Sequence, residues 1–345
     1  MLVAGTDRGV LTETLRCEYG LMIDDIEPIP TGFASACYAV IRGGVASHLI
    51  KVWPGTNASR GPAARLQRTL PLLRALAARV VGVRVPCPLL ARSGELSIAF
   101  HQMPLAVFPF LRGTTPPSWP AWPGAIWDEL ARAMARIHHA SGMVGDVLPE
   151  RDEFGLDLGS QLRDGLARLA ALGTDARPGL RRLRDLLQPR TEQLLDELEQ
   201  LVRARSQLRT IDVEYVLCHT DLGGDNILVA DDGTLSVLDW DEAVMAPAEL
   251  DIKTALESPD PHRFISVYIE AGGIQPLDRQ RLTFFATRRC LEDLTARLTR
   301  MLCEATATRD EQDEQDNKLL DGIVRWGLTA QDDVARGIIA LAPVL

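Results

Sequence analysis

Lysine is scarce in this chain of 345 residues. There are 34 arginines but only three lysines, Lys51, Lys253 and Lys318. Arginine therefore serves wherever a generic surface cation suffices, and a lysine at the end of an apolar strand indicates a site that needs a compact ammonium group on a slim stem. Lys51, which follows the run "SHLI", is such a residue.

Three further absences exclude classes of protein. No apolar run reaches the roughly 18–20 residues that cross a bilayer, so no membrane span is predicted. The N-terminal segment "MLVAGTDRGVLTETL" lacks a basic region followed by a long apolar core and does not predict a signal peptide. The six cysteines are scattered, without a CxxC pair or a Cys/His cluster at zinc spacing. This predicts free thiols in a reducing cytoplasm.

Charge is unevenly distributed along the chain. Residues 1–115 carry a net charge of +5, whereas residues 116–345 carry −15. A basic first part suits a phosphate-bearing ligand and an acidic second part suits a cationic partner, although an ordinary solvated surface explains the asymmetry equally well. The overall charge of −10 argues against nucleic acid as a partner.

Apolar spacing divides the chain into a strand-rich first part and a helical remainder. In the first part we expect strands and two helices, at 12–20, 26–42, 47–53, 61–79 and 105–111. The proline-rich segment 112–124 cannot form a regular element and marks a boundary. Beyond it we expect helices interrupted once by short strands, at 125–141, 160–172, 178–206, 215–241 and 276–304. The pattern predicts an α+β fold, with a small antiparallel sheet followed by a mainly helical part.

The stretch "YVLCHTDLGGDNILVADDGTLSVLDW" (215–240) is the most informative part of the sequence. An apolar strand leads into His219 and Asp221, and a short polar loop then reaches Asn226. An Asp-Asp-Gly turn between two apolar runs predicts a hairpin whose second strand ends at Asp239. This arrangement predicts that Asp221, Asn226 and Asp239 converge.

Phosphoryl transfer from a nucleotide requires such a set of side chains. Asp221 would orient an attacking hydroxyl and accept its proton, while Asn226 and Asp239 would supply oxygens to Mg²⁺. Each residue alone is explained as a turn former or helix cap. Together, the H-x-D-x-x-x-x-N spacing and an aspartate 13 residues later indicate a kinase. His219 is expected to be a hydrogen-bonding residue beneath the loop.

This segment resembles the aminoglycoside phosphotransferases and their relatives, the choline and homoserine kinases. The catalytic loop of that family typically reads H-G-D-L-H-x-x-N and its metal-binding segment I-D-W-(E/D). The matching residues here are His219, Asp221, Leu222, Asn226 and Leu238-Asp239-Trp240-Asp241. Thr220 replaces the usual glycine and Gly223 the usual second histidine. "YGLMIDDIEPIPTGFASACYAV" and "LDWDEAVMAPAELDI" are similar to the spectinomycin phosphotransferases within the family.

The resemblance implies a protein-kinase-like two-lobe fold. Its N-terminal nucleotide-binding lobe would span 1–111, the hinge about 106–113, and the helical C-terminal lobe with the catalytic loop 112–345. The donor would be ATP, with GTP left open, and Mg²⁺ the cofactor. Lys51 would reach the α- and β-phosphates. Ser35 and the turn 30–36 would lie over them unless that turn is a plain hairpin, and backbone groups of Phe110 and Leu111 would bind adenine unless they only form an edge strand.

One expected partner is missing. Kinases of this shape pair the strand lysine with a glutamate on the next helix, yet no Asp or Glu lies between Lys51 and Glu95. Gln67, the nucleotide alone or an acid from elsewhere in the chain would then orient Lys51.

The acceptor is expected near Asp221. Four carboxylates are candidates for binding its cationic amino groups, Asp241, Glu242, Glu292 and Asp293. Intrahelical ion pairs explain Glu292 and Asp293 equally well. We interpret the chain as an ATP-dependent O-phosphotransferase of a small aminocyclitol or aminoglycoside antibiotic, giving resistance. A metabolic kinase for choline, homoserine or a sugar and a nucleotide-binding pseudokinase are the alternatives. Monomer and homodimer are both left open.

Overall fold

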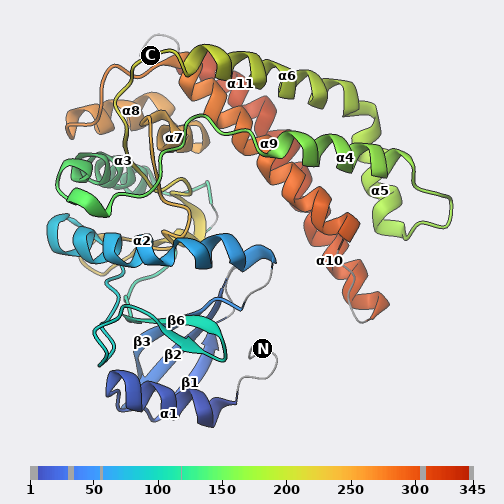
Figure 1. Cartoon of the computed structure of the whole chain (residues 1–345). Helices are drawn as coiled ribbons and strands as arrows, with labels where there is room; N and C mark the ends of the chain where they lie inside the picture. The colour runs from blue at the N-terminus through green and yellow to red at the C-terminus, as the bar shows by residue number, and fades with distance from the viewer. Residues whose placement is uncertain (1–6, 30–34, 55–56, 118, 304–307, 342–345) are drawn as a thin grey trace. The chain divides into compact units, whose positions relative to one another are not determined.

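The computed structural model describes residues 7–29, 35–54, 57–117, 119–303 and 308–341. The chain forms two compact units (Figure 1). Unit 1 comprises Met1–Arg151, Val216–Met245 and Val267–Ile274, and unit 2 comprises Asp152–Tyr215, Ala246–Ser266 and Gln275–Leu345. The predicted α+β fold is confirmed, because an antiparallel sheet forms near the N-terminus and most of the remaining chain is helical. The predicted lobe boundary at residues 111 and 112 stays a prediction.

A five-stranded antiparallel sheet organises the first part of unit 1, with strand order β1-β2-β3-β6-β5. The strands are β1 (Asp25–Ile29), β2 (Ala36–Arg42), β3 (Val45–Val52), β5 (Ile98–Phe100) and β6 (Met103–Pro109). Lys51 on β3 pairs with Cys37 on β2 and with Ala106 on β6. The backbone of Lys51 therefore lies in the central strand, where ladders on both sides fix its position.

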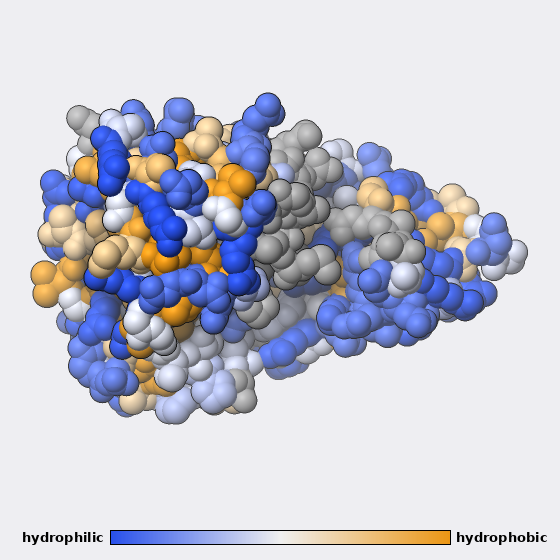
Figure 2. Space-filling model, turned by 90° about the horizontal axis from the view of Figure 1, so that it is seen from below, coloured by the Kyte–Doolittle hydropathy of each residue, from blue (hydrophilic) through white to orange (hydrophobic). Residues whose placement is uncertain are grey.

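Two helices accompany this sheet and lie on opposite sides of it in Figure 1, α1 (Arg8–Tyr19) and α2 (Asn57–Arg79). The side chain of Asp7 caps the start of α1 by accepting from Gly9 N, and Gly20 ends the helix with φ of 67°. Leu11 and Leu15 of α1 are fully buried in the core that includes strand residues such as Ile50. The outer surface on the α1 side mixes hydrophilic and apolar residues (Figure 2).

The rest of unit 1 carries the hairpin predicted from the sequence. β8 (Ile227–Val229) pairs with β9 (Leu235–Val237), and β4 (Val83–Arg84) lies parallel to β9. β7 (Val216–Cys218) pairs with β10 (Val244–Ala246), and α3 (Gly124–His139) packs against β7. Three short 3₁₀ turns complete this part, η1 (Ala140–Gly142), η2 (Gly145–Val147) and η4 (Gly224–Asn226).

Unit 2 is helical. Its elements are α4 (Leu158–Ala170), α5 (Pro178–Leu187), η3 (Gln188–Arg190), α6 (Thr191–Leu208), α7 (Glu249–Ile252), η5 (Lys253–Glu257), the start of α8 (Pro261–Glu270), α9 (Arg279–Cys303), α10 (Arg309–Gly322), the π-helical turn η6 (Ile323–Thr329) and α11 (Ala330–Leu341). The long α9 contacts α4, α6, α10 and α11. No helix of the described residues is long and apolar enough to cross a membrane.

The prediction of a single helix at 178–206 is wrong. The structure contains two helices here, α5 and α6, with Pro189 in the turn between them. Proline has no backbone N–H and its ring clashes with the carbonyl of the preceding turn, so it interrupts a helix. Most of the other predicted elements agree with the structure to within a few residues at each end.

Candidate active site

A buried histidine holds the loop that follows β7. The backbone N–H of Asp221 donates to Nδ1 of His219 at 3.3 Å, and Nε2 of His219 lies 2.7 Å from the carbonyl oxygen of Leu238. Because Nδ1 is an acceptor and the carbonyl can only accept, the neutral ring carries its proton on Nε2. His219 therefore ties the backbone of Asp221 to the residue that precedes Asp239, and it has the hydrogen-bonding role expected from the sequence.

Asn226 joins the loop to the hairpin. Its Nδ2 donates to the backbone oxygen of Asp221 at 3.0 Å and to Oδ2 of Asp221 at 2.9 Å. The backbone carbonyl of Asn226 accepts a hydrogen bond from the backbone N–H of Leu238 at 2.8 Å, next to the β8–β9 ladder. Asn226 thus lies between Asp221 and the neighbour of Asp239, so the structure brings these three predicted residues together.

The donor atoms of Asn226 and Asp239 fit Mg²⁺. With Nδ2 turned toward Asp221, Oδ1 of Asn226 faces away from it, and this oxygen accepts no hydrogen bond within the described part of the chain. Asp239 has an exposed carboxylate, of which only Oδ1 contacts Lys51. An amide oxygen and a carboxylate oxygen are hard ligands of the kind that Mg²⁺ binds.

Thr220, the first departure from the family pattern, has a left-handed backbone with φ of 79°. Glycine adopts this conformation freely because it has no Cβ, which gives a physical reason for the usual glycine at this place. A β-branched residue there stores strain of roughly 1–3 kcal/mol. Asp239 is also left-handed, with φ of 56°. Thr220 lies between His219 and Asp221, and Asp239 directly follows Leu238. The hydrogen bonds that His219 makes with Asp221 and Leu238 therefore hold both left-handed residues in place.

Gly223, the second departure, lies against a tryptophan. A Cβ at this position would be 2.5 Å from Cη2 of Trp119, so no side chain fits there while Trp119 keeps its place. Trp119 packs against the rings of Trp122 and Trp127, at centroid distances of 4.5 and 4.8 Å. An indole from the proline-rich segment therefore contacts the loop at the position of the family's second histidine. The sequence alone does not predict this contact, because the proline-rich segment indicates only a boundary between two parts of the chain.

Lys51 contacts two carboxylates of the segment after β9. Its Nζ is 2.7 Å from Oδ1 of Asp239 and 2.9 Å from Oδ2 of Asp241. Burial lowers the pKa of Lys51, but the charges of Asp241 and Asp239 outweigh it, so the pKa lies above its ordinary value. An acid from elsewhere in the chain thus accompanies Lys51, whereas Gln67 is exposed.

The other predicted nucleotide residues lie on or beside the same sheet. Ser35 precedes β2, and its Oγ is 3.8 Å from Sγ of Cys37. Residues 30–34 of the turn lie outside the described residues. The N–H of Phe110 donates to the carbonyl of Ser47 at 3.0 Å, while the N–H of Leu111 donates to no group among the described residues. Of these two N–H groups, that of Leu111 is the better placed to serve a ligand.

The four predicted acceptor carboxylates have different partners. In unit 1, Asp241 contacts Lys51 and Glu242 pairs with Arg65. In unit 2, Asp293 on α9 pairs with Arg289 at 3.3 Å and Arg297 at 3.2 Å, and Glu292 lies 3.4 Å from Nε of Arg288.

Arg288 is already engaged by a second acid. Its two terminal nitrogens bind both oxygens of Asp152, at 3.0 and 2.6 Å. The cation next to Glu292 is therefore shared between two carboxylates, whereas Asp293 contacts two arginines.

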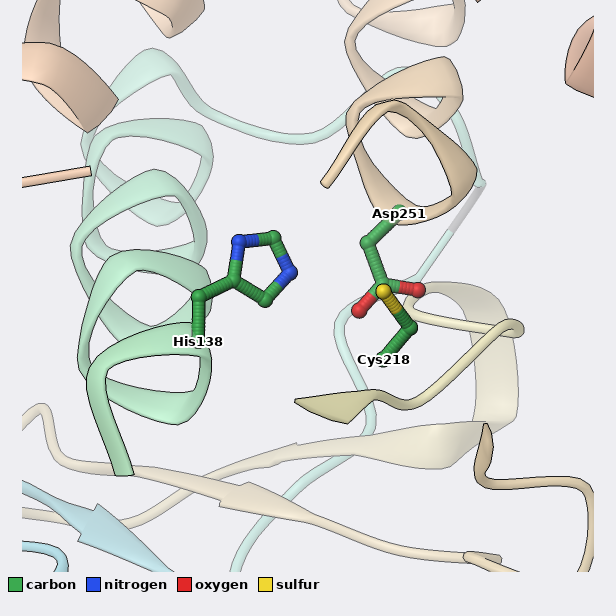
Figure 3. A group of neighbouring side chains, drawn as sticks. All are labelled: His138, Cys218 and Asp251. Carbon is green, nitrogen blue, oxygen red and sulfur yellow. The ribbon is translucent and has the colours of Figure 1, made fainter. Parts of the chain in front are cut away.

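Cys218, at the end of β7, is fully buried. It lies on the side of β7 that meets α3, near the buried His138 (Figure 3). Nδ1 of His138 is 2.8 Å from the hydroxyl of Tyr268. This burial suits a thiol of the core. The six cysteines lie in the described part of the chain, and none of them forms a disulfide there.

The chain belongs to the phosphotransferase enzyme family, whose model matches residues 25–285. The match covers the sheet, α2, the loop from His219 to Asn226 and the segment with Asp239. No curated protein sequence matches the chain.

Solved structures share the fold at low sequence identity. A spectinomycin phosphotransferase in complex with ADP and spectinomycin is 16% identical, with a TM-score of 0.76, over 96% of this chain and 99% of that chain. A choline/ethanolamine kinase family protein from Mesorhizobium loti is 15% identical, with a TM-score of 0.55, over 96% and 99%. A macrolide 2'-phosphotransferase from Brachybacterium faecium is 15% identical, with a TM-score of 0.53, over 92% and 97%. The chain therefore has the kinase-like fold of these proteins.

Proposed function

We propose that the chain is an ATP- and Mg²⁺-dependent O-phosphotransferase of the cytoplasm that phosphorylates a hydroxyl of a spectinomycin-like aminocyclitol or aminoglycoside, giving resistance. The observation that supports this best is the meeting of Lys51 on β3 with Asp239, beside the hydrogen-bonded pair of Asp221 and Asn226. A phosphate-binding cation, a candidate metal ligand and a candidate base then belong to one site, as phosphoryl transfer requires.

Asp221 is the proposed catalytic base. Asn226 Nδ2 holds Oδ2 of Asp221, which fixes the carboxylate plane so that Asp221 can orient an acceptor hydroxyl. As the hydroxyl oxygen bonds to the γ-phosphorus of ATP and ADP leaves, the hydroxyl proton passes to Asp221. Because phosphoryl transfer depends strongly on positioning, this hydrogen bond supports the proposed role of Asp221.

Lys51 would bind the α- and β-phosphates, with Ser35 as a further donor. Asn226 and Asp239 would hold Mg²⁺, which when bound offsets negative charge on the phosphates. The N–H of Leu111 would donate to adenine. The carbonyl of Phe110 belongs to the same planar peptide as this N–H and points the opposite way, so the two groups do not face one ligand together.

The proposal is tested by measuring ADP release from ATP with a panel of acceptors. The panel contains spectinomycin, kanamycin, a macrolide, choline, homoserine and a simple sugar. We expect acceptor-dependent ADP release with spectinomycin or a related aminocyclitol, and a product heavier by one phosphate in mass spectrometry. Turnover with choline, homoserine or the sugar alone would favour a metabolic kinase. Nucleotide binding without turnover on any member would favour a pseudokinase.

Among the acceptor carboxylates, Glu292 is the one that we propose for an acceptor amine. Its nearest cation, Arg288, already binds both oxygens of Asp152 through its terminal nitrogens. By contrast, Asp293 contacts two arginines, Glu242 pairs with Arg65, and Asp241 is buried against Lys51.

We expect Glu292→Gln to raise KM for a cationic acceptor by roughly fivefold or more, with KM for ATP unchanged, because it removes an attraction for the amine. Asp293→Asn, one residue along α9, is the matched control and should change the acceptor KM by less than about twofold. Steady-state kinetics with each substrate varied in turn measures both. Equal effects of the two variants would contradict the assignment of Glu292.

A further inference from the structure

The helix that follows Lys51 cannot supply its acidic partner. α2 contains no Asp or Glu, and Gln67, its long polar residue that could have taken this place, is exposed. A lysine that binds phosphates needs a fixed direction, because its four-carbon stem is flexible. Some other group must therefore hold the ammonium of Lys51.

The two carboxylates beside Lys51 differ in exposure. The side chain of Asp239 is 49% exposed, whereas that of Asp241 is 10% exposed. The exposed Asp239 is also the proposed metal ligand, so its contact with Lys51 has a competitor. Asp241 is not a proposed metal ligand, and its side chain is largely buried. A bound metal would therefore leave the contact between Lys51 and Asp241 in place.

Asp241 is held by a buried tryptophan, Trp53, which directly follows the strand that carries Lys51. Nε1 of Trp53 donates to Oδ2 of Asp241 at 3.0 Å, and the same oxygen accepts from Lys51 Nζ at 2.9 Å. The ammonium of Lys51 lies 5.4 Å from the centroid of the Trp53 ring. Trp53, Asp241 and Lys51 therefore touch one another in a closed set, and one carboxylate oxygen links the indole to the ammonium.

α2 reaches this set with a cation. Nε of Arg65 donates to the backbone carbonyl of Asp241 at 3.0 Å, and the guanidinium of Arg65 also pairs with Glu242. The helix thus binds the segment that carries the acid, and it does not carry the acid itself. α2 therefore contributes a cation, Arg65, to the segment of Asp241, in place of an acid that would contact Lys51 directly.

We propose that Asp241 is the positioning residue of Lys51, and that Arg65 of α2 and Trp53 hold it in place. The pairing of Lys51 with Asp241 stands on the geometry alone, whereas its effect on ATP use rests on the proposed function. When a nucleotide and its metal engage Asp239, Lys51 keeps Asp241 as a counter-ion, so the ammonium stays aimed at the phosphates.

The scarcity of lysine allows a direct test of the pairing. Lysine labelled with ¹³C at Cε gives signals from only three residues, and Lys51→Arg identifies the one from Lys51. In Asp241→Asn we expect the Lys51 signal to shift, because its ammonium loses the carboxylate 2.9 Å away, while the signals of Lys253 and Lys318 stay where they are. Trp53→Phe, which keeps the ring but removes the N–H donor, should shift the same signal less. An unchanged Lys51 signal in both variants would overturn the proposal.

Kinetics tests the consequence for the reaction. Asp241→Asn should raise KM for ATP by roughly tenfold and leave KM for the acceptor within about twofold, since only the nucleotide side is altered. Asp241→Glu should recover part of the loss, and Gln67→Ala, which changes an exposed residue of the same helix, should match the wild type. An equal rise in both KM values, or a large effect of Gln67→Ala, would argue against Asp241 as the positioning residue.

The two arms separate the inference from the proposed function. If the wild type binds no ATP in calorimetry, the kinase proposal fails, while the lysine spectra still decide whether Asp241 holds Lys51. If the wild type is active but Asp241→Asn changes neither the Lys51 signal nor KM for ATP, the inference fails and the kinase proposal stands. If Asp241→Asn does not fold, Trp53→Phe and Asp241→Glu take its place in both arms.

Discussion

Asp221→Asn is expected to lower kcat by roughly 10²–10⁴-fold while leaving ATP affinity within about twofold. The substitution keeps the shape of the side chain but removes the carboxylate that would accept the proton of the acceptor hydroxyl. The bond from Nδ2 of Asn226 to Oδ2 of Asp221 survives when the new amide oxygen takes the place of Oδ2. The loss should therefore report the missing base and leave the loop intact.

Steady-state kinetics and calorimetric titration with ATP measure the two quantities for Asp221→Asn. The matched control is Asp225→Asn, which changes an exposed carboxylate of the same loop and should behave as the wild type. Near-normal turnover of Asp221→Asn would refute the assignment of the base. A parallel loss of ATP affinity would indicate that the loop has rearranged.

Asp239→Asn is expected to reduce kcat/KM for ATP by roughly 10³-fold and to raise the Mg²⁺ concentration needed for half-maximal rate. Asp239 would lose its charge both as a proposed metal ligand and as a partner of Lys51, whose Nζ lies 2.7 Å from its Oδ1. Because both interactions serve the nucleotide, the effect on the acceptor KM should be small.

A titration of the rate with Mg²⁺ at fixed ATP checks the prediction for Asp239. Asp232→Asn, in the turn between β8 and β9, is the control, since this carboxylate bonds to Arg84 and Thr234 at the far end of the hairpin. Wild-type Mg²⁺ dependence in Asp239→Asn would contradict the metal assignment. Excess Mg²⁺ that restores part of the rate would agree with it.

Local patterns were enough to predict much of the fold. The sheet strands and α2 have strong apolar periodicity, and the Asp-Asp-Gly turn marks the β8–β9 hairpin, so these elements follow from neighbouring residues. Pro189 is itself a signal for a break, but the charged residues on both sides of it suit a helix and favour a single long one.

The partners of the candidate site were less predictable. Lys51 and Asp241 are 190 residues apart in the chain, and no local rule relates them; only the fold brings the two side chains into contact. The approach of Trp119 to Gly223 depends in the same way on tertiary packing. The loop pattern did locate Asp221, Asn226 and Asp239 together, because the residues of one loop and one hairpin are necessarily close in space.

The ammonium of Lys51 lies 2.7 Å from one oxygen of Asp239 in this structure. On the proposed function, a divalent ion that approached this carboxylate alone would be repelled by the nearby positive charge. An ion bound to a nucleotide would bring phosphates that attract the ammonium and weaken this repulsion. Metal and nucleotide should therefore enter as a unit, each strengthening the binding of the other by the same factor, as thermodynamic linkage demands.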